Sequence, residues 1–283
     1  MLYKNLLGLI GNTPITVFED IFIKLELFNL AGSIKDRVAL KMIEELELEN
    51  KLNKSSTVIE VTSGNTGIAI AMVCAIKRYK CIIIMPNNVT KDKINIIKAY
   101  GAKVILTPKK LGFDGAIKYA RKLSNKKGYI FLNQFSNIFN PLAHTNTAYE
   151  IINDMQKIDY LVCGIGSGGT ISMLSKILKE KYPMLKVIGV LPDEQNHGIC
   201  GIGASIKSDV FNDTYIDKIE KVSTKDATST FKYLAKKGLL LGLSSSACFY
   251  VSKRIKKQNN DKIVLMISAD SGIKYLSAFD QNA

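Results

Sequence analysis

A lysine stands at the start of a predicted helix, where a charged lysine is poorly placed. The segment GSIKDR, residues 32–37, opens a helix predicted over residues 34–50, so Lys35 falls in its first turn. Ser33 is a good N-cap residue, and Asp36 completes a capping-box pattern with the shorter acid. The positive end of the helix dipole disfavours an ammonium there, which makes the amine easier to deprotonate. A neutral amine can form a Schiff base with an aldehyde; the alternative is one ordinary surface lysine among many.

A second segment, TSGNTG at residues 62–67, follows a predicted strand over residues 57–61 and precedes an apolar helix. Hydroxyls, an amide and backbone N–H groups therefore collect at a helix N-terminus, which is a suitable site for a carboxylate. The same residue types also form ordinary capped turns between a strand and a helix. The segment by itself supports both interpretations equally.

A third segment, GIGSGGT at residues 164–170, lies between a predicted strand and a predicted helix. Its glycines let the backbone approach an anion, and the helix end attracts phosphate. Gly164, Gly166 and Gly169 also satisfy the dinucleotide pattern G-x-G-x-x-G, in which Asp193 would hold a ribose. A single phosphate, a dinucleotide and a purely structural turn all remain open at this point.

Five further residues are candidates for chemistry or for structure alone. Gln134 follows a strand and could donate to a carboxylate, or it is a strand-end amide. Ser244 precedes a helix and either caps it or meets a heteroaromatic nitrogen. We expect His144 to be a structural, hydrogen-bonding histidine and His197 to be exposed. Asp270 is expected in a turn near the chain end, without a chemical role.

The elements that must position these residues alternate along the chain. Strands are predicted at residues 57–61, 80–86, 103–107, 129–135, 159–164, 186–191 and 262–268. Helices are predicted at about 34–50, 66–78, 91–100, 113–125, 142–157, 170–181, 225–237 and 245–257. Apolar strands joined by helical crossovers indicate parallel sheets covered by helices. Ligands of such sheets bind beyond the carboxyl ends of the strands, where all three segments fall.

The composition is that of a globular protein: among 283 residues, 47% are hydrophobic and 23% are charged. This excludes a disordered tail, a collagen-like chain and a coiled-coil rod. The longest apolar runs are far shorter than the roughly 20 residues of a membrane helix. No signal-peptide pattern opens the sequence, so we expect a cytoplasmic protein that does not associate with a membrane.

The formal net charge is +14, yet only four of the 39 basic residues are arginine. Proteins that read nucleic acid rely on arginine, so we expect no nucleic-acid partner and a field that favours small anions. Five scattered cysteines indicate reduced thiols, most of them small core residues. Two histidines without a local cluster give no reason to expect a metal site.

Six segments together resemble the cysteine synthase family of pyridoxal-phosphate enzymes, over nearly the whole chain. They are IGNTPI (10–15), GSIKDR (32–37), TSGNTG (62–67), GSGGT (166–170), GIGAS (201–205) and KYLS (274–277). Each segment is weak alone, and the order and spacing of all six carry the resemblance.

The resemblance implies that pyridoxal 5'-phosphate is the cofactor. Lys35 would bind its aldehyde and later move a proton at the α-carbon of the substrate. Asn65 would bond the cofactor's 3′-oxygen, and Ser244 would face its pyridine nitrogen. The phosphate would be held by Gly166, Ser167, Gly168, Gly169 and Thr170. The substrate carboxylate would be held by Thr62, Ser63, Thr66 and Gln134.

The implied fold is α/β, with two domains that each contain a mostly parallel sheet covered by helices and with the cofactor in the cleft between them. We expect a smaller, mobile domain at residues 40–140, which carries the substrate loop. The larger domain, residues 1–39 and 141–283, would carry the phosphate loop. A homodimer is implied by the resemblance alone.

The implied reaction is β-replacement or β-elimination on L-cysteine or an O-activated L-serine, with sulfide taken up or released. One alternative consumes cysteine to release hydrogen sulfide and form serine or lanthionine, and another is a cystathionine- or diaminopropionate-type synthase. The chain departs from the family in a shortened loop near residues 192–200 and in Ser205, whose hydroxyl favours these alternatives. A nicotinamide-dependent oxidoreductase rests only on residues 164–169.

Overall fold

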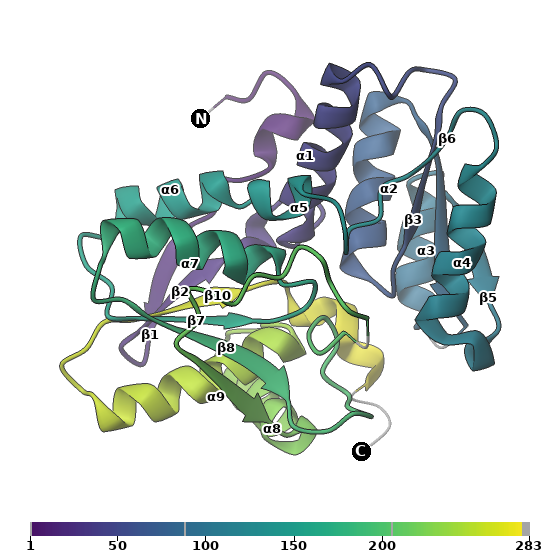
Figure 1. Cartoon of the computed structure of the whole chain (residues 1–283). Helices are drawn as coiled ribbons and strands as arrows, with labels where there is room; N and C mark the ends of the chain where they lie inside the picture. Colours follow the sequence, from purple (N-terminus) through teal and green to yellow (C-terminus); the bar gives the residue numbers. More distant parts are fainter. Residues whose placement is uncertain (1, 88, 205, 279–283) are drawn as a thin grey trace.

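The computed structural model describes residues 2–87, 89–204 and 206–278, which form two sheets side by side (Figure 1). The smaller sheet has four parallel strands in the order β5-β4-β3-β6. Strands β3 and β4 are largely buried on both faces, as expected for apolar strands that helices cover from both sides. The strands are β3 (Thr57–Val61), β4 (Lys80–Pro86), β5 (Lys103–Thr107) and β6 (Tyr129–Phe131).

Four helices cover this sheet. One core cluster joins α1, α2 and α3 to one face, and a smaller cluster joins α4 to the other. Helix α2 is apolar nearly all round, because it is packed between α1, α3 and the sheet. The helices are α1 (Lys35–Leu48), α2 (Asn65–Lys77), α3 (Lys91–Ala99) and α4 (Gly112–Ser124).

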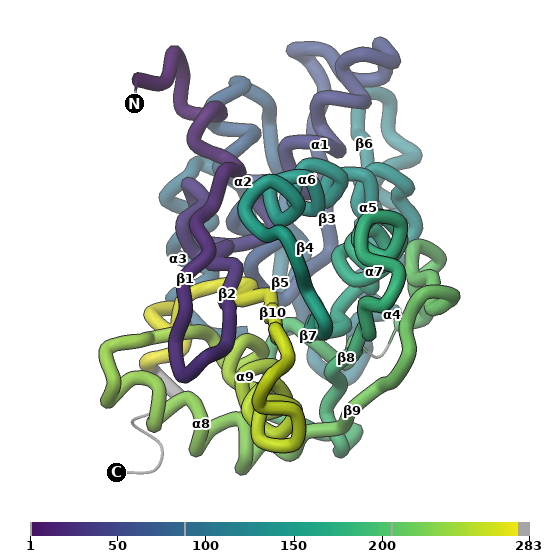
Figure 2. The backbone as a smooth tube through the Cα atoms, turned by 90° about the vertical axis from the view of Figure 1, so that its left-hand side faces the viewer, coloured from purple at the N-terminus to yellow at the C-terminus, as the bar shows by residue number. Residues whose placement is uncertain are grey.

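The larger sheet has six strands in the order β1-β2-β10-β7-β8-β9, and all neighbours except β1 and β2 are parallel. Figure 2 shows the hairpin β1–β2 beside β10, so the two ends of the chain meet in one sheet. The strands are β1 (Ile15–Phe18), β2 (Ile21–Leu25), β7 (Tyr160–Gly164), β8 (Lys186–Pro192), β9 (Lys218–Val222) and β10 (Val264–Ser268).

Helices α6 and α7 pack on one face of the larger sheet, and α8 and α9 pack on the other (Figure 1). They are α6 (Thr145–Asp154), α7 (Gly169–Lys181), α8 (Thr224–Lys236) and α9 (Leu243–Gln258). The short elements are η1 (Leu6–Leu9), η2 (Glu26–Phe28), η3 (Lys109–Leu111), α5 (Phe139–Leu142) and η4 (Gly272–Ala278). Within the described residues, no helix is both long and apolar enough to cross a membrane.

Two parallel-rich sheets covered by helices are present, as the sequence predicts. The pattern does not predict β1, β2 or β9. Glu19 and Asp20 turn the β1–β2 hairpin with φ of 49° and 59°, so its turn lacks the usual Gly or Asn signal. Strand β9 is an edge strand with mostly exposed or half-buried residues. Of the predicted helix over 142–157, α6 forms residues 145–154, and residue 142 instead ends the separate short helix α5. The predicted strand over 129–135 ends at Phe131.

The core of the four-stranded sheet includes residues from Val38 to Ala143. This range is close to the predicted small domain of residues 40–140. The boundary between domains, and the mobility of the smaller one, stay predictions.

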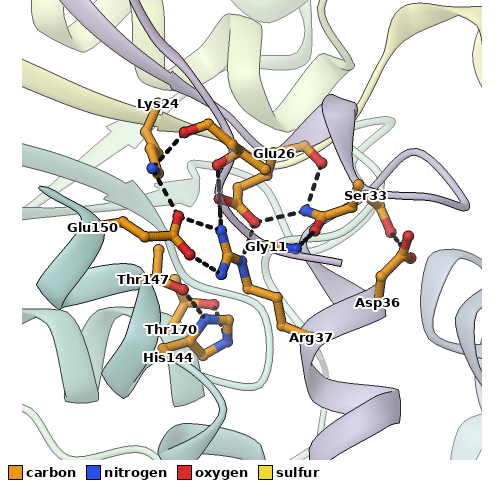
Figure 3. Close-up of polar contacts among 12 residues, drawn as sticks. Gly11, Lys24, Glu26, Ser33, Asp36, Arg37, His144, Thr147, Glu150 and Thr170 are labelled. Carbon is orange, nitrogen blue, oxygen red and sulfur yellow. Dashed lines mark hydrogen bonds and ion pairs between the residues drawn. The ribbon is translucent and has the colours of Figure 1, made fainter. Parts of the chain in front are cut away.

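A buried ionic network beside the first turn of α1 joins the helices of the smaller sheet to the larger sheet (Figure 3). Arg37 of α1 donates from Nε to Glu26 at 2.7 Å and from Nη1 to Glu150 of α6 at 2.6 Å. Lys24 of β2, which is fully buried, pairs with Glu150 at 2.8 Å and donates to the Thr13 carbonyl at 2.6 Å. Burial would raise the pKa of Glu150, but the hydrogen bond and charge of Arg37 outweigh it and lower the pKa to about 2.

Glu150→Gln should therefore lower the free energy of unfolding by about 3 kcal/mol at pH 7, because two buried cations lose their shared carboxylate. The greater stability of the wild type over the variant should persist above pH 4.5 and disappear as the pH falls through about 2, since folding lowers the pKa of Glu150. Urea unfolding at several pH values measures both effects.

The matched control is Glu45→Gln, which breaks the surface ion pair with Lys41 on α1. Its effect should stay within about 1 kcal/mol. An equal loss of stability in both variants would contradict the special role of the buried network.

Candidate active site

A cavity of about 670 Å³ lies where the carboxyl ends of β3, β7 and β10 face one another. It brings together nearly every residue that the sequence singles out. Its lining includes Lys35, Thr62, Ser63, Asn65, Thr66, Gln134, Gly166, Ser167, Gly168, Thr170 and Ser244. Gly169 lies directly behind this lining as the first residue of α7.

Lys35 is the first residue of α1, one residue after its N-cap, Ile34. The prediction of Ser33 as N-cap is wrong by one position, although its hydroxyl accepts the Lys35 N–H at 3.3 Å. Burial lowers the pKa of Lys35, and the neighbouring Cys163 and Asp270 offset only part of this effect. The amine is thus easier to deprotonate, as expected, but the main cause is burial rather than the helix end.

The loop from Gly166 to Thr170 ends at the N-terminus of α7, where amide N–H groups have no partner within the helix. A Cβ at Gly166 would lie 2.4 Å from the Gly201 carbonyl oxygen, and one at Gly169 would lie 2.4 Å from Asn140 Oδ1. Gly168 has a φ of +86°, which favours glycine. The backbone is therefore packed as only glycines allow, and its amides are free for an anion.

Two buried side chains hold this loop from behind. His144 Nε2 lies 3.1 Å from Thr170 Oγ1 (Figure 3), and Asn140 donates to Ser167 Oγ at 2.9 Å. Burial, with the positive charges of Lys35 and Arg37, lowers the pKa of His144 well below its usual range, so the ring is neutral. The expectation of a structural, hydrogen-bonding His144 is confirmed.

The loop at residues 62–67 forms another side of the cavity. Thr66 Oγ1 donates to Gln134 Oε1 at 2.8 Å, although the two residues are 68 positions apart. Gln134 is held further by Glu60, whose carboxyl accepts the Gln134 backbone N–H at 3.2 Å. Burial raises the pKa of Glu60 to about 8, so this carboxyl is mostly neutral at pH 7. Thr62 accepts the Gly64 N–H at 3.1 Å and tightens the turn.

Asp270 is a functional candidate that the sequence reasoning missed. It is buried, and its Oδ2 accepts from Asn65 at 2.7 Å and from the Tyr275 hydroxyl at 2.6 Å. Lys274 donates to Asn65 Oδ1 at 3.2 Å. The expectation of a turn is wrong, because Asp270 forms an isolated β-bridge with Ser33 and is buried. The expectation that it has no chemical role stays untested. The available signal was its place just after β10, since ligands bind beyond the carboxyl ends of strands.

Ser244 lies in the first turn of α9 and lines the cavity. No hydrogen bond within the described part of the chain uses its hydroxyl, which leaves it available to a ligand. His197 is half-buried and also lines the cavity, so the expectation of exposure is wrong. Most of the segment 195–204 lines the cavity, although several of its residues are also exposed to solvent. Ser205 lies outside the described residues.

The family of proteins described as "Pyridoxal-phosphate dependent enzyme" matches residues 6–269. Cysteine synthase B of Campylobacter jejuni is 39% identical over 97% of both chains. The chain belongs to this pyridoxal-phosphate dependent family. Its fold also matches a hydrogen sulfide-producing enzyme from Fusobacterium nucleatum, with a TM-score of 0.92, 38% identity and coverage of 97% of this chain and 100% of that one.

A further match is the O-acetylserine dependent cystathionine β-synthase from Helicobacter pylori, with a TM-score of 0.92, 35% identity and coverage of 98% of both chains. The predictions of the family, of an α/β fold with parallel-rich sheets covered by helices, and of the cofactor are confirmed. The dinucleotide interpretation is wrong, and Asp193 is exposed and does not line the cavity.

The residues present fit pyridoxal phosphate. Free amides and close-packed glycines at α7 suit a phosphate, a half-buried lysine with a lowered pKa suits an aldehyde, and an uncommitted serine hydroxyl suits a ring nitrogen. The individual roles of Lys35, Ser244 and the loop residues remain proposals, taken up below.

Gly166→Ala should weaken cofactor retention at least tenfold, because its Cβ would collide with the Gly201 carbonyl and push the loop apart. Absorbance of the bound cofactor after dialysis measures this. Gly238→Ala is the control: Gly238 has a φ of +85° in open space, so its loss costs about 1 kcal/mol of stability without changing retention. Equal retention in the two variants would contradict the assignment of the loop.

Proposed function

We propose that this chain catalyses β-replacement or β-elimination on L-cysteine or an O-activated L-serine, in the manner of a cysteine synthase, with sulfide taken up or released. The observation that carries the proposal is the single cavity in which the Lys35 amine, the loop at α2 and the glycine loop at α7 meet. Membership of the pyridoxal-phosphate family and 39% identity to a cysteine synthase support it.

Each part of the cofactor has a proposed partner. Lys35 binds the aldehyde, Ser244 faces the ring nitrogen, and Asn65 bonds the 3′-oxygen. The phosphate is held by Gly166, Ser167, Gly168, Gly169 and Thr170. When bound, the cofactor supplies an electron sink that stabilises negative charge at the α-carbon of the substrate.

The chain's own residues orient the substrate and move its proton. Thr62, Ser63, Thr66 and Gln134 hold the carboxylate at the N-terminus of α2, which fixes the α-carbon near Lys35. With its lowered pKa, the released Lys35 amine takes the α-proton. A neutral serine opposite the ring nitrogen makes the ring a weaker electron sink than a carboxylate would, which suits loss of the β-substituent.

The identity of the leaving group and the nucleophile separates two related alternatives. A hydrogen sulfide-producing enzyme and an O-acetylserine dependent cystathionine β-synthase share this fold at 38% and 35% identity. Release of sulfide from cysteine, or addition of a second amino acid, therefore remains the second candidate. We further propose a cytoplasmic homodimer.

Steady-state assays with O-acetylserine plus sulfide, O-phosphoserine, L-serine and L-cysteine test the function. We expect the purified protein to be yellow and to turn over at least one of these substrates with loss of its β-substituent. Sulfide release from L-cysteine alone would favour the second candidate. A protein that turns over none of the four would contradict the proposal.

Lys35→Ala should lower turnover by about 10²–10⁴-fold or more, because the variant lacks both the imine-forming amine and the α-proton acceptor. Borohydride reduction followed by peptide mapping should label the wild type at Lys35. Lys41→Ala, which alters a half-exposed lysine on the same helix, should retain activity and labelling. Labelling of another lysine would overturn the assignment.

A further inference from the structure

The structure assigns a second cation to the substrate site. We propose that Lys93 of α3 binds the α-carboxylate of the amino-acid substrate, together with the N-terminus of α2. This inference rests on the proposed function and deepens it, because it adds a charged partner to a loop otherwise composed of hydroxyls, amides and glycines.

Lys93 is a buried cation at the wall of the cavity. Only 5% of the residue is exposed, and it is among the residues that line the cavity. It makes no ion pair or hydrogen bond within the described part of the chain. A buried ammonium without an anionic partner is costly, so an anion that enters the cavity would meet a cation that still lacks one.

The ammonium lies against the substrate loop. A Cβ placed on Gly64 would lie 3.5 Å from both Cε and Nζ of Lys93. Gly64 is the N-cap of α2, a helix of 13 residues, and the first amides of that helix have no intrahelical partner. The free amides and an ammonium without a direct ion pair therefore face the same end of the cavity, which is the arrangement that a carboxylate requires.

Tyr275 keeps this cation in place. Lys93 Nζ lies 4.8 Å from the centre of the Tyr275 ring, and the Tyr275 hydroxyl is fixed by its bond to Asp270. Asp270 accepts from Asn65 and Tyr275 through Oδ2, while its buried Oδ1 has no hydrogen-bond partner in the described residues. The charge of Lys93 opposes the rise in the pKa of Asp270 that burial causes, but no ion pair joins the two groups there. The ring face attracts the ammonium without neutralising it, which leaves the charge for a ligand.

The carboxylate is the anion that this geometry favours. The glycine loop at α7 is the proposed phosphate site, and it is built by a different helix around Asn140 and His144. Lys93 instead joins the loop at α2, where Thr66 and Gln134 are already linked. A substrate carboxylate there would place the α-carbon between this loop and Lys35.

Calorimetric titration of the holoenzyme with L-alanine and with ethylamine tests the inference. The two ligands differ by the carboxylate, and neither has a leaving group, so binding is measured without turnover. Lys93→Met should weaken the binding of L-alanine at least about tenfold and the binding of ethylamine less than about twofold. Lys93→Arg, which keeps the charge, should stay within about threefold of the wild type for both ligands.

Lys98→Met, at an exposed lysine of the same helix, is the matched control and should bind both ligands like the wild type. In steady state, Lys93→Met should raise KM for the amino-acid substrate about tenfold while kcat changes less than about threefold. Unchanged binding of L-alanine, or equal weakening of L-alanine and ethylamine, would overturn the role of Lys93 alone. A wild type that does not bind L-alanine would overturn the proposed function as well.

Discussion

Arg37 lies two residues after Lys35, and its guanidinium is shared between Glu26 and Glu150 in the interior of the protein. These charge-assisted bonds are short and directional, so they fix the rotation and height of the first turn of α1. Helix α1 packs with the four-stranded sheet, while Glu150 lies on α6 against the six-stranded sheet. The position of the Lys35 amine relative to both halves of the cavity depends on this one buried network.

The same burial that makes the network rigid also prepares the chemistry. Lys35 and His144 lie close to Arg37, and burial lowers the pKa values of both groups. Lys24 is fully buried, but its charge is paired with Glu150, as expected for a lysine with a structural role. Within the described part of the chain, no ion pair or hydrogen bond joins Lys93 to a carboxylate, and Asp270 acts on its charge only from a greater distance. The distinction between structural and ligand-binding lysines therefore lies in their partners, not in their burial.

The cavity is assembled from strand ends that are distant in the sequence. Thr66 meets Gln134, and Asn65 meets Asp270, across separations of 68 and 205 residues. Parallel strands make this possible, because their carboxyl ends gather at one edge and each is followed by a helix N-terminus. The loops at α2 and α7 both lie at the N-terminus of a helix that follows a strand. In the proposed function, one of them holds a phosphate and the other a carboxylate, on different sides of one cavity.

By itself, the sequence determined the alternation of strands and helices, the three loops that carry chemistry and the order of motifs typical of the family. These are local properties, set by hydrophobic period, by glycine where the backbone must approach an anion, and by residue types at helix ends. The sequence pattern did not predict the hairpin β1–β2, because its turn uses Glu19 and Asp20 at positive φ instead of the usual glycine or asparagine. Lys93 was not among the residues that the sequence analysis singled out, although it is buried four residues before Ile97 on one face of α3.

Only the tertiary structure decided which polar side chains face the cavity and which already have partners. Asp270 looked like a turn residue and is buried beside Asn65, and His197 looked exposed and lines the cavity. Burial and compensation of charge depend on contacts between segments far apart in the chain, and such contacts leave no periodic signal in the sequence. For that reason the sequence predicts the chemistry of this site better than its electrostatics.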